Sequence, residues 1–127
     1  AWACCDVRAV VLMKLLFVCS KNLLRSPTAE AVFSTYEGVE VLSAGTSSDA
    51  ENTVSSDLIE WADIVFVMEA IHRKRLNQRF GSLLRSTRIV VLGIPDKYEY
   101  MDPELIRLLE REVSRHLPEI HPTTRDR

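Results

Sequence analysis

Apolar runs alternate with amphipathic segments along the chain, and this alternation predicts strands that are each followed by a helix. Unbroken apolar runs are typical of strands covered on both faces. They predict four strands, at residues 14–19, 39–42, 64–68 and 88–92. Apolar positions that recur at the spacing of one helix face predict helices. They predict four helices, at residues 28–36, 53–61, 70–80 and 103–117.

This order of elements predicts an α/β protein with a three-layer α/β/α architecture and a four-stranded parallel sheet. Crossovers between parallel strands are right-handed, so the C-terminal ends of all four strands meet at one edge of the sheet. We expect residues 13–117 to form one domain. Residues 1–12 are interpreted as an N-terminal extension outside the fold, and residues 118–127 as a C-terminal tail.

The loop between the first strand and the first helix is the main candidate for chemistry. Backbone N–H groups in such a loop, together with the positive end of the helix dipole, bind a tetrahedral oxyanion and stabilise a thiolate at Cys19. The planar fork of Arg25 holds two phosphate oxygens. Ser26 is expected to cap the helix, with Pro27 at its first position, and its hydroxyl to donate toward the thiolate. We therefore expect nucleophilic attack on phosphorus, with a buried strand cysteine and an incidental arginine as the structural alternative. The candidate phosphate-binding residues are Ser20, Lys21, Asn22, Leu23, Leu24, Arg25 and Ser26.

The residues around this loop carry a resemblance to a known family. They are Phe17, Val18, Cys19, Asn22, Arg25, Ser26, Pro27, Ala29, Glu30, Ala31 and Phe33. Together they resemble the signature of the low-molecular-weight protein tyrosine phosphatases. Residues 43–46 resemble the segment after that family's second strand, and residues 62–69 and 94–98 match later blocks more loosely. The resemblance implies a metal-independent phosphatase that needs no cofactor and forms a cysteinyl-phosphate. It also implies that the Ser43 hydroxyl braces the loop through Asn22, with ordinary turn chemistry as the alternative.

Two aspartates compete for the role of general acid, which must protonate the leaving oxygen. Asp102 precedes Pro103 and a strong helical pattern, so we interpret it as a helix cap. Asp96 follows the fourth strand, at the edge where open α/β sheets bind ligands. The resemblance puts Asp96 in the acid's place in an Asp-Pro-Tyr motif, although Lys97 replaces the proline. Tyr98 is then expected to wall the pocket and stack on an aromatic substrate, with ordinary loop packing as the alternative.

Three departures separate this chain from the family pattern. Lys21 replaces a glycine two places after the nucleophile. If that position has positive φ, the lysine needs an unfavourable conformation or the loop differs; the alternative is that the lysine adds charge at the rim of the pocket. Leu24 replaces a second cysteine, and the segment 46–62 is shorter than in typical members. We therefore expect part of the family's usual pocket wall to be missing.

Composition and charge limit the kinds of partner and the cellular location that we expect for this protein. A chain of 127 residues with 46% apolar and 27% charged residues is ordinary for one soluble domain, and a net charge of -2 favours neither a nucleic-acid nor a membrane partner. The apolar stretch 9–18 is too short to cross a bilayer and has no signal-peptide layout. Three cysteines, Cys4, Cys5 and Cys19, make no disulfide framework, so we expect a cytoplasmic location. We expect Cys4 and Cys5 to lie in an unstructured terminus; the alternative is that one of them takes part in redox chemistry with Cys19.

The helix 70–80 carries His72, Arg73, Lys74, Arg75 and Arg79. We interpret this run as a solvated helix face, with a docking patch for an acidic partner as the alternative. His72 has no second ligand at metal spacing, so no metal is assigned.

Rival functions use the same cysteine loop. A non-catalytic module would bind phosphate or a phosphorylated protein, and a cysteine phosphocarrier would need neither Asp96 nor rapid hydrolysis. A related arsenate reductase would need further cysteines after the loop, and none follows Cys19. We expect the partner to be a phosphorylated protein or a small phosphomonoester.

Overall fold

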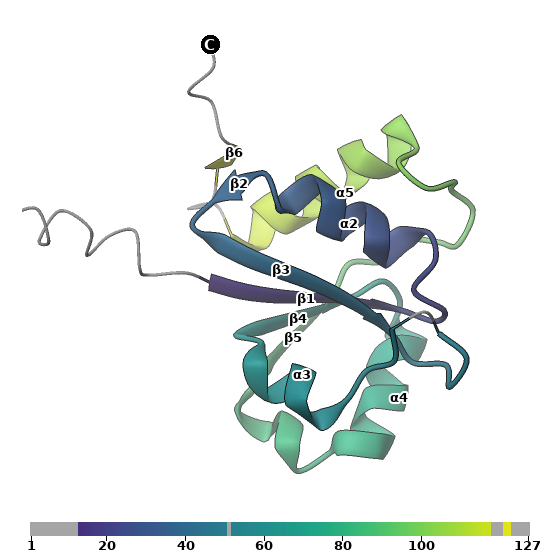
Figure 1. Ribbon diagram of the computed structural model, residues 1–127, viewed down its shortest axis with the longest axis vertical. Coiled ribbons are helices and arrows are strands. Elements are labelled where there is room, and N and C mark those ends of the chain that lie inside the picture. Colours follow the sequence, from purple (N-terminus) through teal and green to yellow (C-terminus); the bar gives the residue numbers. More distant parts are fainter. Residues whose placement is uncertain (1–12, 51, 118–120, 123–127) are drawn as a thin grey trace, which may run out of the picture.

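A computed structural model describes residues 13–50, 52–117 and 121–122 of the chain (Figure 1). Cys4 and Cys5, the extension 1–12 and most of the predicted tail lie outside these described residues. The strands are β1 (Met13–Cys19), β2 (Tyr36–Glu37), β3 (Val39–Gly45), β4 (Ile64–Val67), β5 (Arg88–Val91) and β6 (His121–Pro122). The helices are α2 (Arg25–Phe33), α3 (Ser56–Trp61), α4 (Ala70–Phe80), the short 3₁₀ helix η2 (Leu83–Ser86) and α5 (Pro103–His116).

The central sheet has four parallel strands in the order β3-β1-β4-β5. Helices α2 and α5 cover one face and α3 and α4 the other (Figure 1). The predicted α/β class and four-stranded parallel sheet are therefore confirmed. Because all four strands run the same way, the loops after β1, β3, β4 and β5 leave the sheet at one edge, which is the edge predicted to carry the site.

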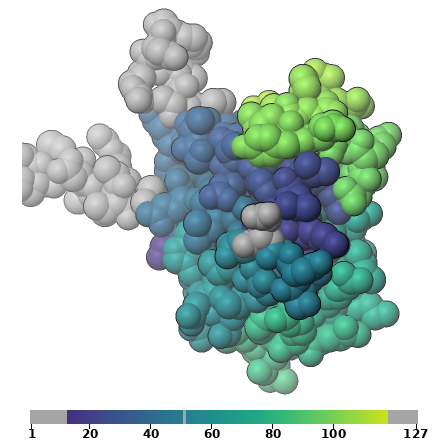
Figure 2. Space-filling view, turned by 45° about the vertical axis from the view of Figure 1, so that its right-hand side comes forward, coloured from purple at the N-terminus to yellow at the C-terminus, as the bar shows by residue number. Residues whose placement is uncertain are grey.

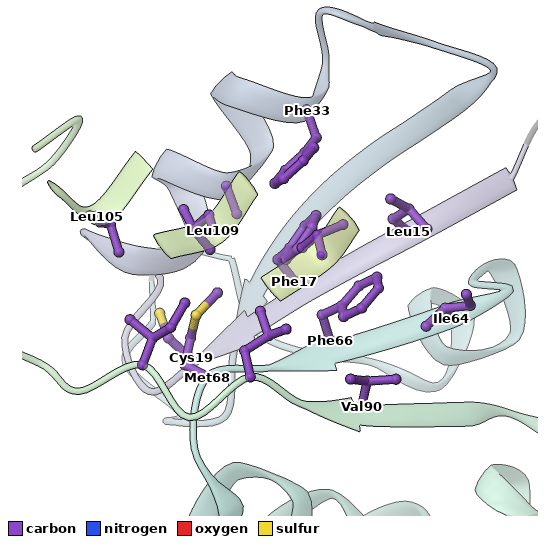
Figure 3. Packing of buried hydrophobic residues seen from close by; sticks show 14 of the residues in the cluster. Leu15, Phe17, Cys19, Phe33, Ile64, Phe66, Met68, Val90, Leu105 and Leu109 are labelled. Atoms are coloured by element: carbon purple, nitrogen blue, oxygen red, sulfur yellow. The ribbon is translucent and has the colours of Figure 1, made fainter. Parts of the chain in front are cut away.

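Alternating side chains of β1 build two hydrophobic cores. Leu15, Phe17 and Cys19 face the core under α2 and α5, whereas Leu16 and Val18 face the core under α3 and α4. Figure 3 shows the first of these cores, with the aromatic rings in its centre. There the Phe17 ring stacks on Phe33 at 5.5 Å and on Phe66 at 5.2 Å between ring centroids. This packing anchors β1, so the loop that follows Cys19 starts from a rigid strand.

Helix α2 begins earlier than the sequence pattern indicated. The Leu24 carbonyl accepts the Thr28 backbone N–H, so the helix starts at Arg25 and ends at Phe33 instead of spanning 28–36. Ser26 was therefore wrongly predicted as its N-cap, because it lies inside the first turn. Pro27 is tolerated in that turn because N–H groups of the first turn have no partner within a helix.

The segment after α2 also differs from the prediction. The chain leaves the helix before residue 36, and Gly38, with φ of 84°, makes the turn from β2 into β3. Strand β3 continues to Gly45, so residues 43–45 are strand and not loop. Part of the predicted tail, His121–Pro122, pairs antiparallel with β2 in a small second sheet that the sequence did not indicate.

Later elements follow the sequence pattern closely. Helix α4 spans Ala70–Phe80, as predicted, and α5 begins behind Asp102, whose carboxylate accepts the Glu104 backbone N–H at 2.9 Å. Asp102 is thus the helix cap that the sequence indicated. In the part of the chain that the structure describes, no helix has the length and apolar character needed to span a membrane.

Candidate active site

A hollow of about 130 Å³ opens at the C-terminal edge of the sheet. Two segments far apart in the sequence form it, the loop after β1 and the loop after β5. Its lining residues are Cys19, Ser20, Lys21, Leu23, Leu24, Arg25 and Asp96. The fold thus brings Cys19 and Asp96 to one site, as their positions at strand ends indicated.

The Cys19 sulfur is held by two groups of its own loop. The Asn22 backbone N–H donates to Sγ at 3.2 Å, and the Ser26 hydroxyl lies 3.0 Å from Sγ. Ser26 also donates to the Asn22 side-chain oxygen at 2.8 Å, so with a neutral thiol the S–H donates to Ser26. When the sulfur is a thiolate, the serine hydroxyl can turn to donate to it. Two donors are therefore available to the negative sulfur.

The loop residue with a left-handed backbone conformation is Asn22 and not Lys21. Asn22 has φ of 58°, in the left-handed region that asparagine tolerates better than most residues. Lys21 is absent from the positive-φ residues of the described chain, so replacing glycine by lysine brings no backbone strain there. The glycine is therefore not required for the turn itself.

Arg25 is the buried cation of the hollow, with 3% of its side chain exposed. Its Nη1 donates to the Ile94 carbonyl at 2.7 Å and to the Glu69 carboxylate at 3.0 Å. These two bonds fix the plane of the guanidinium, whose Nε lies 3.7 Å from a carboxylate oxygen of Asp96. A fixed planar fork at the base of a hollow is suited to a tetrahedral oxyanion.

Asp96 lines the hollow next to Arg25 and is 66% exposed. It follows Ile94, whose carbonyl holds Arg25, so the loop after β5 supplies both a support for the arginine and a carboxylate beside it. The carboxylate is therefore within reach of a group bound at Arg25 and also of solvent.

Two predicted site residues lie elsewhere. The Ser43 hydroxyl donates to the Glu30 carboxylate and not to Asn22, because Glu30 on α2 faces β3; Ser26 makes the bond to Asn22 instead. Tyr98 is 8% exposed, belongs to the core under α2 and α5, and does not line the hollow. Its predicted place as a pocket wall is therefore corrected to loop packing.

The sequence analysis missed two supporting residues, Glu69 and His72, at the start of α4. The Glu69 backbone N–H donates to His72 Nδ1 at 3.0 Å, so Nδ1 carries no proton. His72 Nε2 then carries the hydrogen and donates to the Ser20 hydroxyl at 3.0 Å. Glu69 in turn holds Arg25. The available signal was a Glu-x-x-His pattern directly after a buried strand, which forms a reciprocal cap at the helix start.

The predicted basic face of α4 needs correction in the same place. His72 is fully buried and does not belong to a solvated surface, and Arg79 donates to the Thr46 carbonyl at 3.2 Å. The burial of His72 was not predicted because the residues that follow it in the sequence are charged.

Gly45 allows the segment after β3 to lie against the loop. A Cβ at this position would be 2.5 Å from the Ser20 carbonyl oxygen and 2.6 Å from the Ala50 Cβ. The close approach lets the Thr46 and Ser47 N–H groups donate to the Cys19 and Ser20 carbonyls at 2.9 and 2.8 Å. In the space-filling view the teal-blue segment after β3 lies directly beside the purple loop (Figure 2). These two hydrogen bonds hold the Cys19 and Ser20 carbonyls away from the hollow. Carbonyl oxygens that pointed into the hollow would repel an anion.

His72 makes the stability of the fold pH-dependent. Burial lowers the pKa of His72 from its ordinary 6.5 to about 4, and the positive charge of Arg25 lowers it as well. The unfolded chain therefore binds a proton that the folded chain does not, and stability present above pH 6.5 is lost as the pH falls toward 4. One pKa unit corresponds to about 1.4 kcal/mol, and screening by solvent at the hollow reduces the effect, so we expect a loss of about 2 kcal/mol.

Urea unfolding between pH 7 and pH 4 measures this loss. His72→Gln should be less stable at pH 7 but lose about 2 kcal/mol less than the unsubstituted protein over this range. His116→Gln, at the end of α5, serves as the matched control. Equal pH dependence in the protein and in His72→Gln would contradict the assignment.

Among residues 13–50, 52–117 and 121–122, no group of three or more histidine, cysteine or acidic side chains is arranged to hold a metal ion. The positive charge at the hollow comes from Arg25 and Lys21, which line it, and the N-terminal end of α2 adds a partial positive charge.

Comparisons with known proteins agree with this geometry. Residues 14–64 match the family model for low molecular weight phosphotyrosine protein phosphatases. The YwlE arginine phosphatase from Geobacillus stearothermophilus is similar in structure, with 24% identity, a TM-score of 0.67, and coverage of 84% of this chain and 94% of that one. A comparison with curated protein sequences finds no match.

Two further solved structures share the fold. The tyrosine phosphatase Wzb from Escherichia coli K30, in complex with phosphate, has 19% identity and a TM-score of 0.66, with 85% of this chain and 98% of that chain covered. The low molecular weight protein tyrosine phosphatase SP-PTP from Streptococcus pyogenes has 18% identity and a TM-score of 0.69, with 91% and 96% covered.

The chain therefore shares the fold of these phosphatases, and its cysteine loop lies in the part that the family model matches. The residues that match the family model include Cys19, Arg25 and the loop between them.

Proposed function

We propose that this protein hydrolyses phosphotyrosine or another aryl or small phosphomonoester, without a metal, through a cysteinyl-phosphate intermediate. The observation that carries the proposal is the setting of Cys19. Its sulfur lies within hydrogen-bond distance of the Asn22 N–H and the Ser26 hydroxyl, in a hollow that Arg25 and Asp96 also line. Nucleophile, oxyanion donors and acid–base group thus surround one small volume.

In the first step the Cys19 thiolate attacks phosphorus, and a sulfur–phosphorus bond forms as the bond to the leaving oxygen breaks. The Asp96 carboxyl gives its proton to that oxygen, which leaves as an alcohol or phenol. The products are cysteinyl-phosphate and the Asp96 carboxylate.

In the second step the Asp96 carboxylate takes a proton from water, and the water oxygen attacks phosphorus. The sulfur–phosphorus bond breaks, and Cys19 leaves as the thiolate with release of inorganic phosphate. In both steps the loop N–H groups of residues 20–26 and the fork of Arg25 hold the equatorial oxygens. Within this loop, His72 positions the Ser20 hydroxyl, and the Ser26 hydroxyl lies next to the Cys19 sulfur.

The rim of the hollow favours an aryl leaving group. Leu23 and Leu24 are 50% and 38% exposed and line the hollow, so they can pack against an aromatic ring. One related structure is an arginine phosphatase. In this chain the apolar leucines and the nearby cation Lys21 favour an aromatic group over a positively charged guanidinium.

Asp96→Asn tests the proposal, because asparagine cannot carry a proton between the leaving oxygen and water. We expect kcat for phenyl phosphate to fall by about 10²–10³-fold, with a smaller fall for p-nitrophenyl phosphate, whose leaving group needs less protonation. The measurement is steady-state hydrolysis of both esters in the presence of a chelator.

Asp102→Asn is the matched control, since asparagine also caps helices well and the variant should keep its activity. Unchanged turnover in Asp96→Asn would contradict the phosphatase mechanism. Phosphate binding without any turnover by the reduced protein would point instead to a binding module or a phosphocarrier.

A further inference from the structure

Lys21 lines the hollow, but the two chemical steps of the proposed mechanism do not use its side chain. It occupies the position where the family pattern has glycine. Its backbone has no positive φ, so the loop conformation does not depend on this residue. Its Nζ lies 3.3 Å from the Asp49 carboxylate, and both side chains are mostly exposed, at 59% and 66%.

Asp49 lies in the segment after β3 that backs the loop. The Ser47 hydroxyl donates to the Asp49 carboxylate, and this bond and Lys21 lower the pKa of Asp49 below its ordinary value. The aspartate is therefore ionised at neutral pH and can pair with the lysine. An exposed ion pair of this kind contributes little to stability, so an incoming anion can displace it readily.

The mouth of the hollow consequently has two unlike sides. Lys21 and its partner Asp49 form a charged side, whereas the exposed Leu23 and Leu24 form an apolar side. A phosphomonoester whose phosphate is bound at Arg25 must leave through this mouth. Its body then meets apolar surface on one side and an ammonium group on the other.

We propose that Lys21 is a specificity-determining residue, which binds a second anionic group, a carboxylate or a phosphate, next to the reacting phosphate of the substrate. Asp49 occupies Lys21 when that second anion is absent. The inference rests on the proposed phosphatase function and names the substrate class as phosphomonoesters with a neighbouring acidic group. An acidic residue beside a phosphotyrosine and a carboxylate on a small aryl phosphate share this chemistry.

The test compares two phosphotyrosine peptides that differ only in a glutamate or a glutamine next to the phosphotyrosine. We expect kcat/KM to be about five- to tenfold higher for the glutamate peptide at low salt, with the ratio falling as salt is raised. Lys21→Met should bring the ratio to within about twofold of unity. Asp49→Asn should raise it by about two- to threefold, because the competing carboxylate is gone.

Lys97→Met is the matched control, since Lys97 is exposed and follows Asp96 in the chain; its ratio should equal that of the unsubstituted protein. A ratio that Lys21→Met leaves unchanged, or that Lys97→Met abolishes, would overturn the inference. The same comparison on phenyl phosphate with and without a ring carboxylate separates the two sources, because selectivity confined to one pair identifies that source.

If the proposed phosphatase function itself is wrong, neither peptide will be dephosphorylated, and this result differs from a failure of the inference about Lys21. In that case the affinities of Cys19→Ser for the same two peptides, measured by calorimetry, give the ratio without chemistry. A preference for the glutamate peptide that Lys21→Met removes in this background supports the inference, and equal affinities refute it.

Discussion

Replacement of Cys19 by serine is expected to reduce hydrolysis of p-nitrophenyl phosphate by at least roughly 10⁴-fold. A serine hydroxyl can accept the Asn22 N–H and contact Ser26 as the sulfur does, so the loop should keep its shape. The alcohol is nevertheless a far weaker nucleophile than a thiolate. Binding of inorganic phosphate or vanadate should persist, since Arg25 and the loop N–H groups are unchanged.

The measurement combines steady-state hydrolysis with calorimetric titration of vanadate. Mass spectrometry of the acid-quenched intact protein during turnover should find one phosphoryl group on Cys19. A variant in which Cys4 and Cys5 are both serine is the control for the remaining cysteines. More than about one per cent residual activity in Cys19→Ser would refute the nucleophile assignment.

Arg25→Lys is the second substitution with a large expected effect, a fall in kcat/KM of about 10³-fold. Lysine keeps the positive charge but loses the planar fork. The guanidinium of Arg25 uses Nη1 for the Ile94 carbonyl and Glu69, and this leaves the Nε side directed to the hollow. A lysine ammonium cannot satisfy the buried carbonyl and two phosphate oxygens in the same plane.

Kinetics and phosphate inhibition together test this role. We expect the inhibition constant for inorganic phosphate to rise along with the loss in kcat/KM, because both states use the same fork. Arg79→Lys, which alters an arginine bonded to the Thr46 carbonyl outside the hollow, should remain active. Phosphate affinity in Arg25→Lys equal to that of the unsubstituted protein would contradict the assignment.

The elements with strong local patterns were predictable. Helix α4 was predicted to its last residue, because its periodic apolar positions are followed by a glycine. The start of α5 at Asp102 and Pro103 was equally predictable, because a helix cap and a proline in the first turn are local features of the sequence. The start of α2 was not, because Ser26 and Pro27 form the same local pattern but the Ser26 hydroxyl is engaged with Cys19 and Asn22.

The candidate site shows the same division. Cys19, Arg25 and Asp96 could be placed at one sheet edge from the alternation of strands and helices and the handedness of the crossovers. The roles expected of Ser43 and Tyr98 were corrected by packing, since Ser43 meets Glu30 and Tyr98 enters the core. Glu69 and His72 went unrecognised because a run of charged neighbours made the start of α4 resemble solvated surface.

By itself, the sequence determined the α/β architecture and the cysteine–arginine loop, because periodicity and loop chemistry are properties of neighbouring residues. Only the tertiary structure decided which side chains support that loop: Glu69 holds Arg25, His72 orients Ser20, and Asp49 pairs with Lys21. These contacts join residues 28 to 52 positions apart. They depend on the distance and orientation that the folded sheet imposes, and no local pattern contains that information.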